Sequence, residues 1–238
     1  MTVNFPEDVA RKLWDSYYVP FVKGWFDGQG RFRSDDIKTG NVLAYVGSSS
    51  SATYFPKQVM TSDTESHDIT LKVLPCPSFA GCKPVSVQQG AGMVVTNTTQ
   101  EEVEASVIFL KWFTQPENNV QFAVGSGYLP VTHEADDINF VDNSGLNLTE
   151  NMHNILSEAI NAVENNELYT PKPFNGGAAA RKVLEYGISD KATADRAAVE
   201  EKIAAGQSAE EAEAEYLTDE AFESWYQDIL SQLNEYQG

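Results

Sequence analysis

The segment of residues 99–131 constrains the fold most strongly, because it predicts two helices that abut at a corner. Thr99 and Glu102 stand at the spacing of a capping box, in which each side chain satisfies a free backbone N–H of the other residue. Apolar residues then recur at helical period. Thr114 and Glu117 repeat the box spacing around a proline, so a second helix is expected to begin where the first one ends.

The second helix should end in the heptapeptide GSGYLPV, residues 125–131. Glycine readily accepts the left-handed conformation that closes many helices, so Gly125 or Gly127 is expected to terminate this one. Pro130 restricts the backbone at the exit. The sequence therefore predicts a stiff turn that holds the ring of Tyr128 in a fixed place.

The rest of the chain predicts strands early and helices late. A helix over Pro6–Val19 should precede strands at Val42–Val46 and Ile69–Leu74, and Val85–Val95 is expected to form two strands around a glycine interruption. Few tight hairpin signals separate these strands. The expected class is therefore α/β, mostly helical towards the C-terminus, with a few strands in a parallel or mixed sheet.

Apolar stripes predict which faces of the helices are buried, and a further capping box predicts where another helix begins. Ser208 and Glu211 form the further box, and the longest loop is expected at residues 165–177. Trp112 is assigned to the core of its helix. The predicted stripes consist of Val9, Leu13, Tyr17 and Tyr18; of Met152, Ile155, Leu156, Ala159 and Val163; and of Phe222, Trp225, Ile229 and Leu233.

The composition excludes several classes of function. The 238 residues include 35 acidic and 16 basic side chains and carry a net charge of −19. Phosphate backbones are bound by clusters of Lys and Arg, and none is present, so a nucleic-acid partner is excluded. No apolar run approaches the roughly 18 residues of a membrane-spanning helix. The N-terminus lacks a basic region followed by an apolar one, so it is not a signal peptide.

Catalytic and metal motifs are absent from the sequence. The three histidines lie far apart, and no zinc-protease, nucleophile-elbow or phosphate-loop pattern occurs. We therefore expect no catalytic residue, no metal and no cofactor. Cys76 and Cys82 are compatible either with a short-loop disulfide in an oxidising compartment or with two free thiols, and both alternatives stay open.

Four consecutive serines follow the first predicted strand. Hydroxyls and backbone N–H groups at a strand-to-helix turn can form a polar corner that binds a ligand. They can equally cap the following helix. The run therefore predicts either a binding corner at Ser48, Ser49 and Ser50 or a plain helix start.

The order of four segments resembles the C-terminal half of an extracellular solute-binding protein of a bacterial ABC importer. The segments are TGNVLAYVGSSSSA, LPCPSFAG, QQGAGMVVTNTT and EEVEASVIFLKWFTQPENNVQFAVGSGYLPVT, over about Thr39–Thr132. The C-terminal pieces SAEEA and ESWYQDILSQL are also similar to the family's ending. The group that these segments resemble most is the carbohydrate-binding one, which includes maltose-binding and glycerol-phosphate-binding proteins.

The resemblance implies a periplasmic-binding-protein-like (type II) fold, in which two lobes close on a ligand around a hinge. Members are usually longer and carry an export signal. Residues 1–238 are therefore expected to be the C-terminal portion of such a protein, lacking most of the N-terminal lobe. A hinge or cross-over strand is expected near residues 85–97, and residues 148–238 should form a helical tail.

The resemblance also implies which residues contact the ligand. Ser48 to Ser50 match the loop that supplies hydrogen bonds, and Tyr128 matches a tyrosine that lines the cleft. The backbone at Gly90, Ala91 and Gly92 should approach the ligand closely. Apart from the resemblance, Tyr54 and Trp25 are further candidate aromatic platforms because both lie near glycine or serine loops, with core packing as the alternative for each. Arg181 falls where glycerol-phosphate-binding relatives have an anion-binding arginine, with an ordinary surface arginine as its alternative.

The function implied is that of a non-enzymatic receptor. It would bind a carbohydrate or polyol outside the cell, be held at the membrane as a lipoprotein or in the periplasm in the parent protein, and serve the permease subunits of an ABC importer. An alternative is a truncated fragment that binds no solute and acts as a structural or interaction module. In that case an exposed apolar surface would favour a dimer of the fragment. An enzyme on this scaffold would need an acid/base pair or metal cluster that the sequence does not offer.

Overall fold

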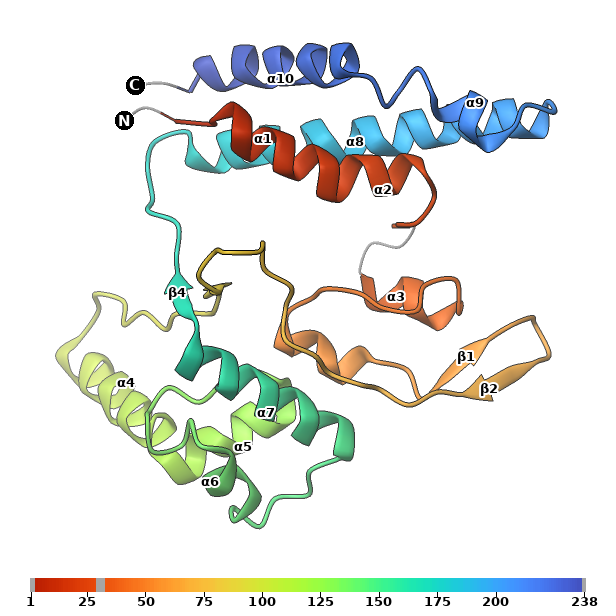
Figure 1. Ribbon diagram of the computed structural model, residues 1–238. Helices are drawn as coiled ribbons and strands as arrows, with labels where there is room; N and C mark the ends of the chain where they lie inside the picture. Colours follow the sequence, from red (N-terminus) through yellow and green to blue (C-terminus); the bar gives the residue numbers. More distant parts are fainter. Residues whose placement is uncertain (1–2, 29–32, 237–238) are drawn as a thin grey trace. The chain divides into compact units, whose positions relative to one another are not determined.

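The computed structural model describes residues 3–28 and 33–236, and the chain divides into two compact units (Figure 1). The terminal unit combines Met1–Gln29 with Lys172–Gly238. The central unit is the continuous segment Gly30–Pro171. Each unit has its own cluster of buried apolar side chains. Both units are therefore described separately below.

The terminal unit is built from helices at both ends of the chain. Its hydrophobic core brings aromatic residues of the N-terminal helices against the C-terminal helices. The elements are α1 (Glu7–Leu13), the π-helix η1 (Trp14–Tyr18), α2 (Val19–Val22), α8 (Gly177–Ala204), α9 (Ala209–Glu213) and α10 (Asp219–Asn234).

The apolar face of the N-terminal helix differs from the predicted one. Val9 and Leu13 are exposed and Tyr17 is only partly buried, whereas Tyr18 is buried as predicted, together with Ala10 and Trp14. The three buried residues recur at four-residue steps, and the wider turn of the π-helix keeps Trp14 and Tyr18 on the same side. Their rings stack with centroids 3.7 Å apart. The predicted stripe was therefore wrong at Val9 and Leu13, and it missed Ala10 and Trp14, each one position further along the helix.

A polar network accompanies this core. The buried hydroxyl of Tyr18 donates a hydrogen bond to the carboxylate of Asp195, which Lys191 also contacts with its ammonium at 2.8 Å. Burial, and then the hydrogen bond to Asp195, raise the pKa of the Tyr18 hydroxyl far above its usual range. The phenol therefore stays a neutral donor, which compensates for burying its oxygen.

The last helix follows the prediction. All four residues of its predicted stripe, which include Phe222 and Trp225, are buried. The indole N–H of Trp225 donates to the carbonyl oxygen of Gly187 on α8 at 2.9 Å. A Cβ atom at Gly187 would lie 2.2 Å from the Cδ1 atom of Ile229, so a residue with a side chain here would require the end of the Ile229 side chain to move.

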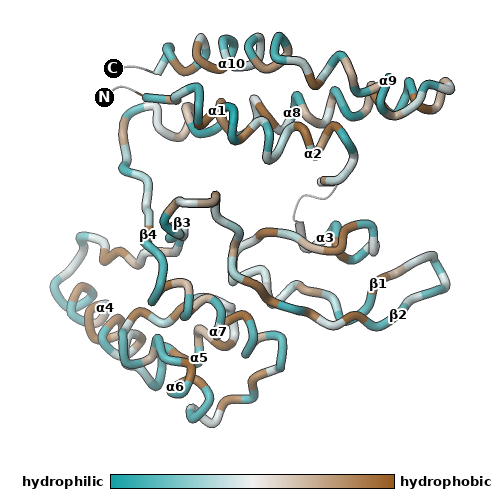
Figure 2. Tube along the Cα trace, viewed as in Figure 1, coloured by the Kyte–Doolittle hydropathy of each residue, from teal (hydrophilic) through white to brown (hydrophobic). Residues whose placement is uncertain are grey.

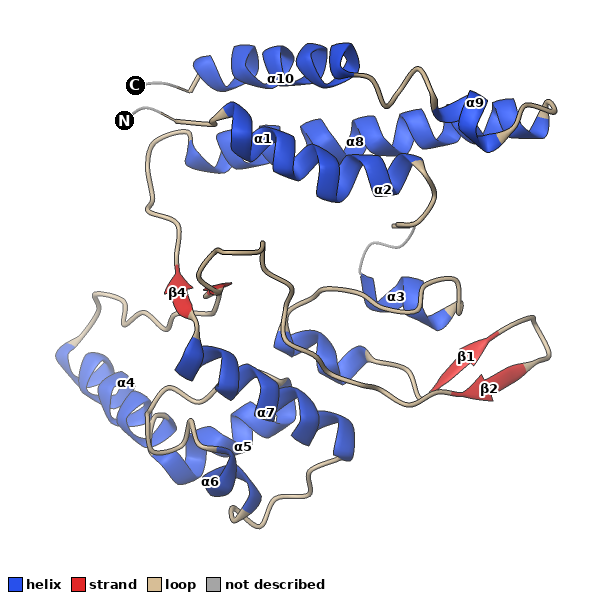
Figure 3. Ribbon diagram, viewed as in Figure 1, coloured by secondary structure: helices blue, strands red, loops and turns tan. Residues whose placement is uncertain are grey.

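The central unit is mostly helical, with strands of only three residues (Figure 3). Its two sheets have two strands each: β1 and β2 are antiparallel, and β3 and β4 are parallel. Strand β4 lies within the loop expected at residues 165–177. The elements are α3 (Arg33–Lys38), the 3-10 helix η2 (Ser49–Tyr54), β1 (Gln58–Met60), β2 (Ser66–Asp68), β3 (Val85–Val87), α4 (Gln100–Phe113), α5 (Pro116–Ser126), α6 (Ile138–Asp142), α7 (Glu150–Asn165) and β4 (Glu167–Tyr169).

The strand predictions were mostly wrong. Val42–Val46 and Ile69–Leu74 adopt no strand, and Leu43 is fully exposed. Of Val85–Val95 only the first three residues pair, with β4. A strand needs a neighbouring backbone to accept and donate its hydrogen bonds. An apolar or alternating run without such a neighbour stays an extended loop, whatever its pattern.

The helix boundaries were predicted better. The capping boxes at Thr99 and Ser208 are confirmed, because both reciprocal hydrogen bonds of each box are present. The second box was wrong: Gln115 is the N-cap of α5, and the hydroxyl of Thr114 donates back to the carbonyl oxygen of Leu110 at 2.9 Å. Thr114 ends α4, so its side chain cannot also cap α5. Trp112 is not a core residue, since it is 52% exposed.

The core of the central unit lies between α5, α6 and α7. Met152 and Leu156 are buried as predicted, and Ile160 completes the buried stripe of α7. The other predicted stripe residues of α7, Ile155, Ala159 and Val163, are only partly buried. Val120 of α5 packs with this cluster. This core supports the start of the turn that follows α5.

Candidate functional site

The serine corner, residues 48–51, leads into the 3-10 helix η2. The hydroxyls of Ser48 and Ser50 lie 3.0 Å apart, and that of Ser51 donates to the carbonyl oxygen of Ser48 at 2.6 Å. Tyr45 contacts the Ser51 hydroxyl at 3.1 Å through its own hydroxyl. The corner thus presents hydroxyl groups that orient one another, with Ser48 exposed to solvent. It follows an extended loop rather than the expected strand.

The glycine turn packs directly against this corner. Gly127 closes α5 in the left-handed conformation, with φ of +73°, which confirms the predicted helix end. A Cβ atom at Gly127 would lie 2.7 Å from the carbonyl oxygen of Ser49 and 3.1 Å from the Cα atom of Ser50. No side chain fits at such distances. The missing side chain of Gly127 therefore allows two sequence-distant motifs to touch.

Asn119 fixes the exit of the turn, and the sequence analysis missed it. Its side chain is 1% exposed, and its oxygen accepts a hydrogen bond from the backbone N–H of Val131 at 2.9 Å. Val120 and Ala123 are the other buried residues of α5. A polar residue on the inward face of a short helix was the available signal for such a role.

Replacing Asn119 with alanine should lower the free energy of unfolding by about 1–3 kcal/mol, because the Val131 amide would lose its partner. Urea denaturation followed by circular dichroism measures this loss. Glu117, which is exposed on the same helix, provides the control. Equal effects of the two alanine variants would contradict the role given to Asn119.

Tyr128 stands beside the corner on the same turn. Its ring lies 5.8 Å from that of Phe122, and 39% of the residue is exposed. Its backbone N–H donates to the hydroxyl of Ser126 at 3.3 Å. Tyr54 projects from η2, the helix that begins within the serine corner, and it too is largely exposed. Two aromatic rings near a group of hydroxyls are thus available to solvent.

The other residues predicted to contact the ligand lie in other segments of the chain. Gly90, Ala91 and Gly92 are exposed in a loop of the central unit, and a Cβ at either glycine would meet no atom within 4 Å among the described residues. Trp25, which is 71% exposed, and Arg181, exposed on α8, belong to the terminal unit. The structure therefore brings together the serine corner, Tyr54 and the turn of Tyr128.

Acidic groups lie beyond the turn. Burial raises the pKa of Asp136, the charge of Glu164 raises it further, and His133 opposes the shift. His153 contacts Asp142 at 3.2 Å. Over residues 3–28 and 33–236 no group of three His, Cys, Asp or Glu side chains is arranged to hold a metal ion. Cys76 and Cys82 are exposed free thiols in this structure.

The comparison with known families adds an independent finding. The sequence model of a family described as "Bacterial extracellular solute-binding protein" matches residues 6–149. The chain belongs to this family of bacterial extracellular solute-binding proteins. The match includes the serine corner and the turn of Tyr128, whereas Arg181 lies outside it. No curated protein and no solved structure matches the chain.

Membership confirms the resemblance seen in the sequence. Solute-binding proteins of the ABC-importer type bind a small molecule and do not transform it, in agreement with the expected absence of catalysis. Their place is outside the cytoplasmic membrane. Within the part of the chain that the structure describes, no helix has the length and apolar character needed to span a bilayer.

Proposed function

We propose that this solute-binding protein captures a sugar or a similar small polar solute and delivers it to the permease subunits of an ABC importer. The observation that carries the proposal is the packing of Gly127 against Ser49 and Ser50. It joins a group of hydroxyls to a turn that presents an aromatic ring. The same proposal places the protein outside the cytoplasmic membrane, either anchored to the membrane as a lipoprotein or within the periplasm.

The chemistry of a sugar matches these groups. A sugar ring has an apolar face of C–H groups and a rim of hydroxyls, so it binds to an aromatic ring beside fixed polar groups. Tyr128 and Tyr54 would cover the apolar face, and the hydroxyls of Ser48 and Ser50 would bond the rim. The exposed backbone of Gly90–Gly92 would add polar groups without side chains in the way. Trp25 and Arg181 stay predictions as further contacts.

Calorimetric titration of the protein with a library of saccharides and polyols tests the proposed ligand class. Heat of binding for at least one member is the expected result. Absence of binding to every saccharide and polyol would reject the sugar assignment, because the aromatic and hydroxyl groups would then serve another solute.

Replacing Tyr128 with alanine should weaken binding of the sugar found in that screen by about tenfold, or about 1.4 kcal/mol, since the apolar face of the sugar would lose the ring that covers it. The melting temperature should change little, because the ring is partly exposed and its ring contact is with Phe122. Tyr169→Ala, at an exposed tyrosine of β4, is the control and should bind normally. A large loss of stability in Tyr128→Ala would instead identify a core residue.

A further inference from the structure

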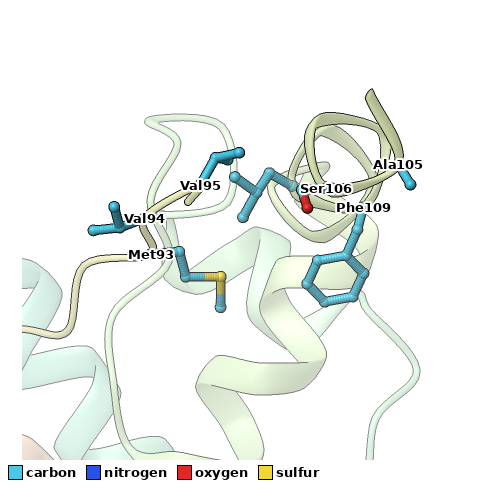
Figure 4. A pocket seen from close by; sticks show the side chains of 7 residues that line it. Met93, Val94, Val95, Ala105, Ser106 and Phe109 are labelled. Carbon is cyan, nitrogen blue, oxygen red and sulfur yellow. The ribbon is translucent and has the colours of Figure 1, made fainter. Parts of the chain in front are cut away.

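A long exposed loop joins β2 to β3 in the central unit (Figure 2). Residues 74–84 are all exposed to solvent, and the ring-bearing Phe79 among them is 49% exposed. The chain beyond β3 lies against a helix, because Met93–Val95 line a groove together with Phe109 of α4 (Figure 4). Exposed loops are preferred sites of proteolytic cleavage. The loop before β3 is therefore a segment that a covalent constraint would protect.

Both cysteines of the chain lie in this loop. Cys76 and Cys82 are exposed free thiols, and the sequence contains no other cysteine. The backbone N–H of Cys82 donates to the carbonyl oxygen of Phe79 at 3.0 Å, and Gly81 has a φ of +78°. These are the features of a tight turn with glycine at its third position. The chain thus reverses direction between the two cysteines, which shortens the distance that a disulfide has to span.

The arm that carries Cys76 is free to fold back onto this turn. A disulfide needs Cα atoms about 4.4–6.8 Å apart, and residues 76–78 are exposed and belong to no helix or strand. Pro75 and Pro77 restrict the backbone on both sides of Cys76, so less conformational freedom is lost on closure. Short loops hold their ends at effective concentrations on the order of millimolar. Each thiol therefore meets the other one far more often than it meets a second chain.

The family to which the chain belongs is extracellular. Disulfides form and persist in oxidising surroundings of this kind. We propose that Cys76 and Cys82 form an intramolecular disulfide when the protein is outside the cell, and that the resulting ring of residues 76–82 protects the loop before β3 from proteases. The two free thiols of the structure are the reduced form of this pair.

Thiol–disulfide exchange with a small-molecule disulfide carries out the oxidation. The thiolate of one cysteine attacks a sulfur of the small disulfide, which forms a mixed disulfide and releases one small thiol. The thiolate of the other cysteine then attacks the protein sulfur of the mixed disulfide and releases the second small thiol. Two protein thiols are thereby oxidised to one disulfide, the small disulfide is reduced to two thiols, and the two protons pass to the released thiolates.

Oxidised glutathione is the probe that tests the disulfide. The reduced full chain is incubated with an excess of it at mildly alkaline pH, remaining thiols are alkylated, and tryptic peptides are weighed by mass spectrometry. Both cysteines fall in the peptide that begins at Val73, because Pro84 prevents cleavage after Lys83. This peptide should be unalkylated and lighter than the dithiol by two hydrogen atoms. Alkylation of both cysteines, glutathione on both, or a disulfide-linked dimer would overturn the proposal.

Cys76→Ser is the matched control for ring closure. Cys82 of this variant should keep glutathione as a stable mixed disulfide, because the thiol that displaces it is missing. Release of glutathione from Cys82 at the same rate as in the original protein would show that Cys76 does not close the ring.

Cleavage by chymotrypsin after Phe79 tests the protective role. The oxidised chain should be cut about tenfold more slowly than the reduced one, since a protease acts on an opened conformation that the ring disfavours. Cleavage after Tyr54, which is 66% exposed outside the ring, should proceed equally in both states. A variant with both cysteines replaced by serine should show no difference after the two treatments. Equal cleavage after Phe79 in the oxidised and reduced original protein would overturn the protective role.

Discussion

Replacing Trp14 with alanine should destabilise the terminal unit by about 3–5 kcal/mol, the usual cost of removing a large aromatic side chain from a core. Trp14 is 1% exposed and stacks on Tyr18. Its ring also meets the rings of Phe222 and Trp225 at 5.7 and 5.4 Å. The variant would leave a cavity where helices from both ends of the chain come together. We therefore expect loss of packing between the N-terminal helices and α10.

Urea denaturation followed by far-ultraviolet circular dichroism measures this effect. Leu13→Ala is the matched control, because Leu13 is the neighbouring residue and is exposed. It should cost about 1 kcal/mol or less, as substitutions outside the core usually do. The sequence pattern placed Leu13 on the apolar face, so the two predictions differ clearly. A greater loss in Leu13→Ala than in Trp14→Ala would favour the face predicted from sequence.

Leu13 and Trp14 show how much of the fold a local sequence pattern can predict. The helix itself follows from apolar residues at helical period, and capping boxes gave the starts of two other helices because their hydrogen bonds lie within three residues. The sequence also contains no short-range signal for the π-helix at Trp14–Tyr18. Helix existence was therefore predictable, whereas the buried face of the first helix was not.

The strand predictions were wrong for a different reason. The run Val42–Val46 has the composition of a buried strand, yet Leu43 is fully exposed. Strand formation depends on a partner that the run itself does not encode. Strand β3 found one in β4, some 80 residues later, through Asn166 and Ser86 as well as the backbone ladder. Pairing over such separations cannot be inferred from one segment.

The candidate site shows the same difference between local features, which the sequence predicts, and contacts between distant residues, which it does not. Each of its two motifs was visible in the sequence, because serine runs and glycine-closed helices are local features. Their contact through Gly127 is not local, and neither is the hydrogen bond of Asn119 to Val131. Trp25 was grouped with the site because it lies near a glycine loop, and Arg181 by resemblance; the structure assigns both to the terminal unit.

Replacing Gly127 with alanine should destabilise the central unit by about 2–4 kcal/mol, from the strain of a left-handed residue with a Cβ atom and from overpacking. The methyl group would press on the backbone at Ser49 and Ser50, which cannot rotate away as a side chain can. The serine corner would have to move from the turn. Binding of the sugar identified by calorimetry should therefore weaken by at least about tenfold even where the protein stays folded.

Gly125→Ala is the control, two residues earlier in the same sequence. Gly125 lies within α5, and a Cβ there would meet no described atom within 4 Å. Alanine is the better helix former, so this variant should be more stable by about 0.5–1 kcal/mol and should bind as the original protein does. Thermal denaturation and calorimetry on both variants make the comparison. Normal stability and binding in Gly127→Ala would show that the serine corner does not rest on this turn, and the proposed site would lose the contact on which it is built.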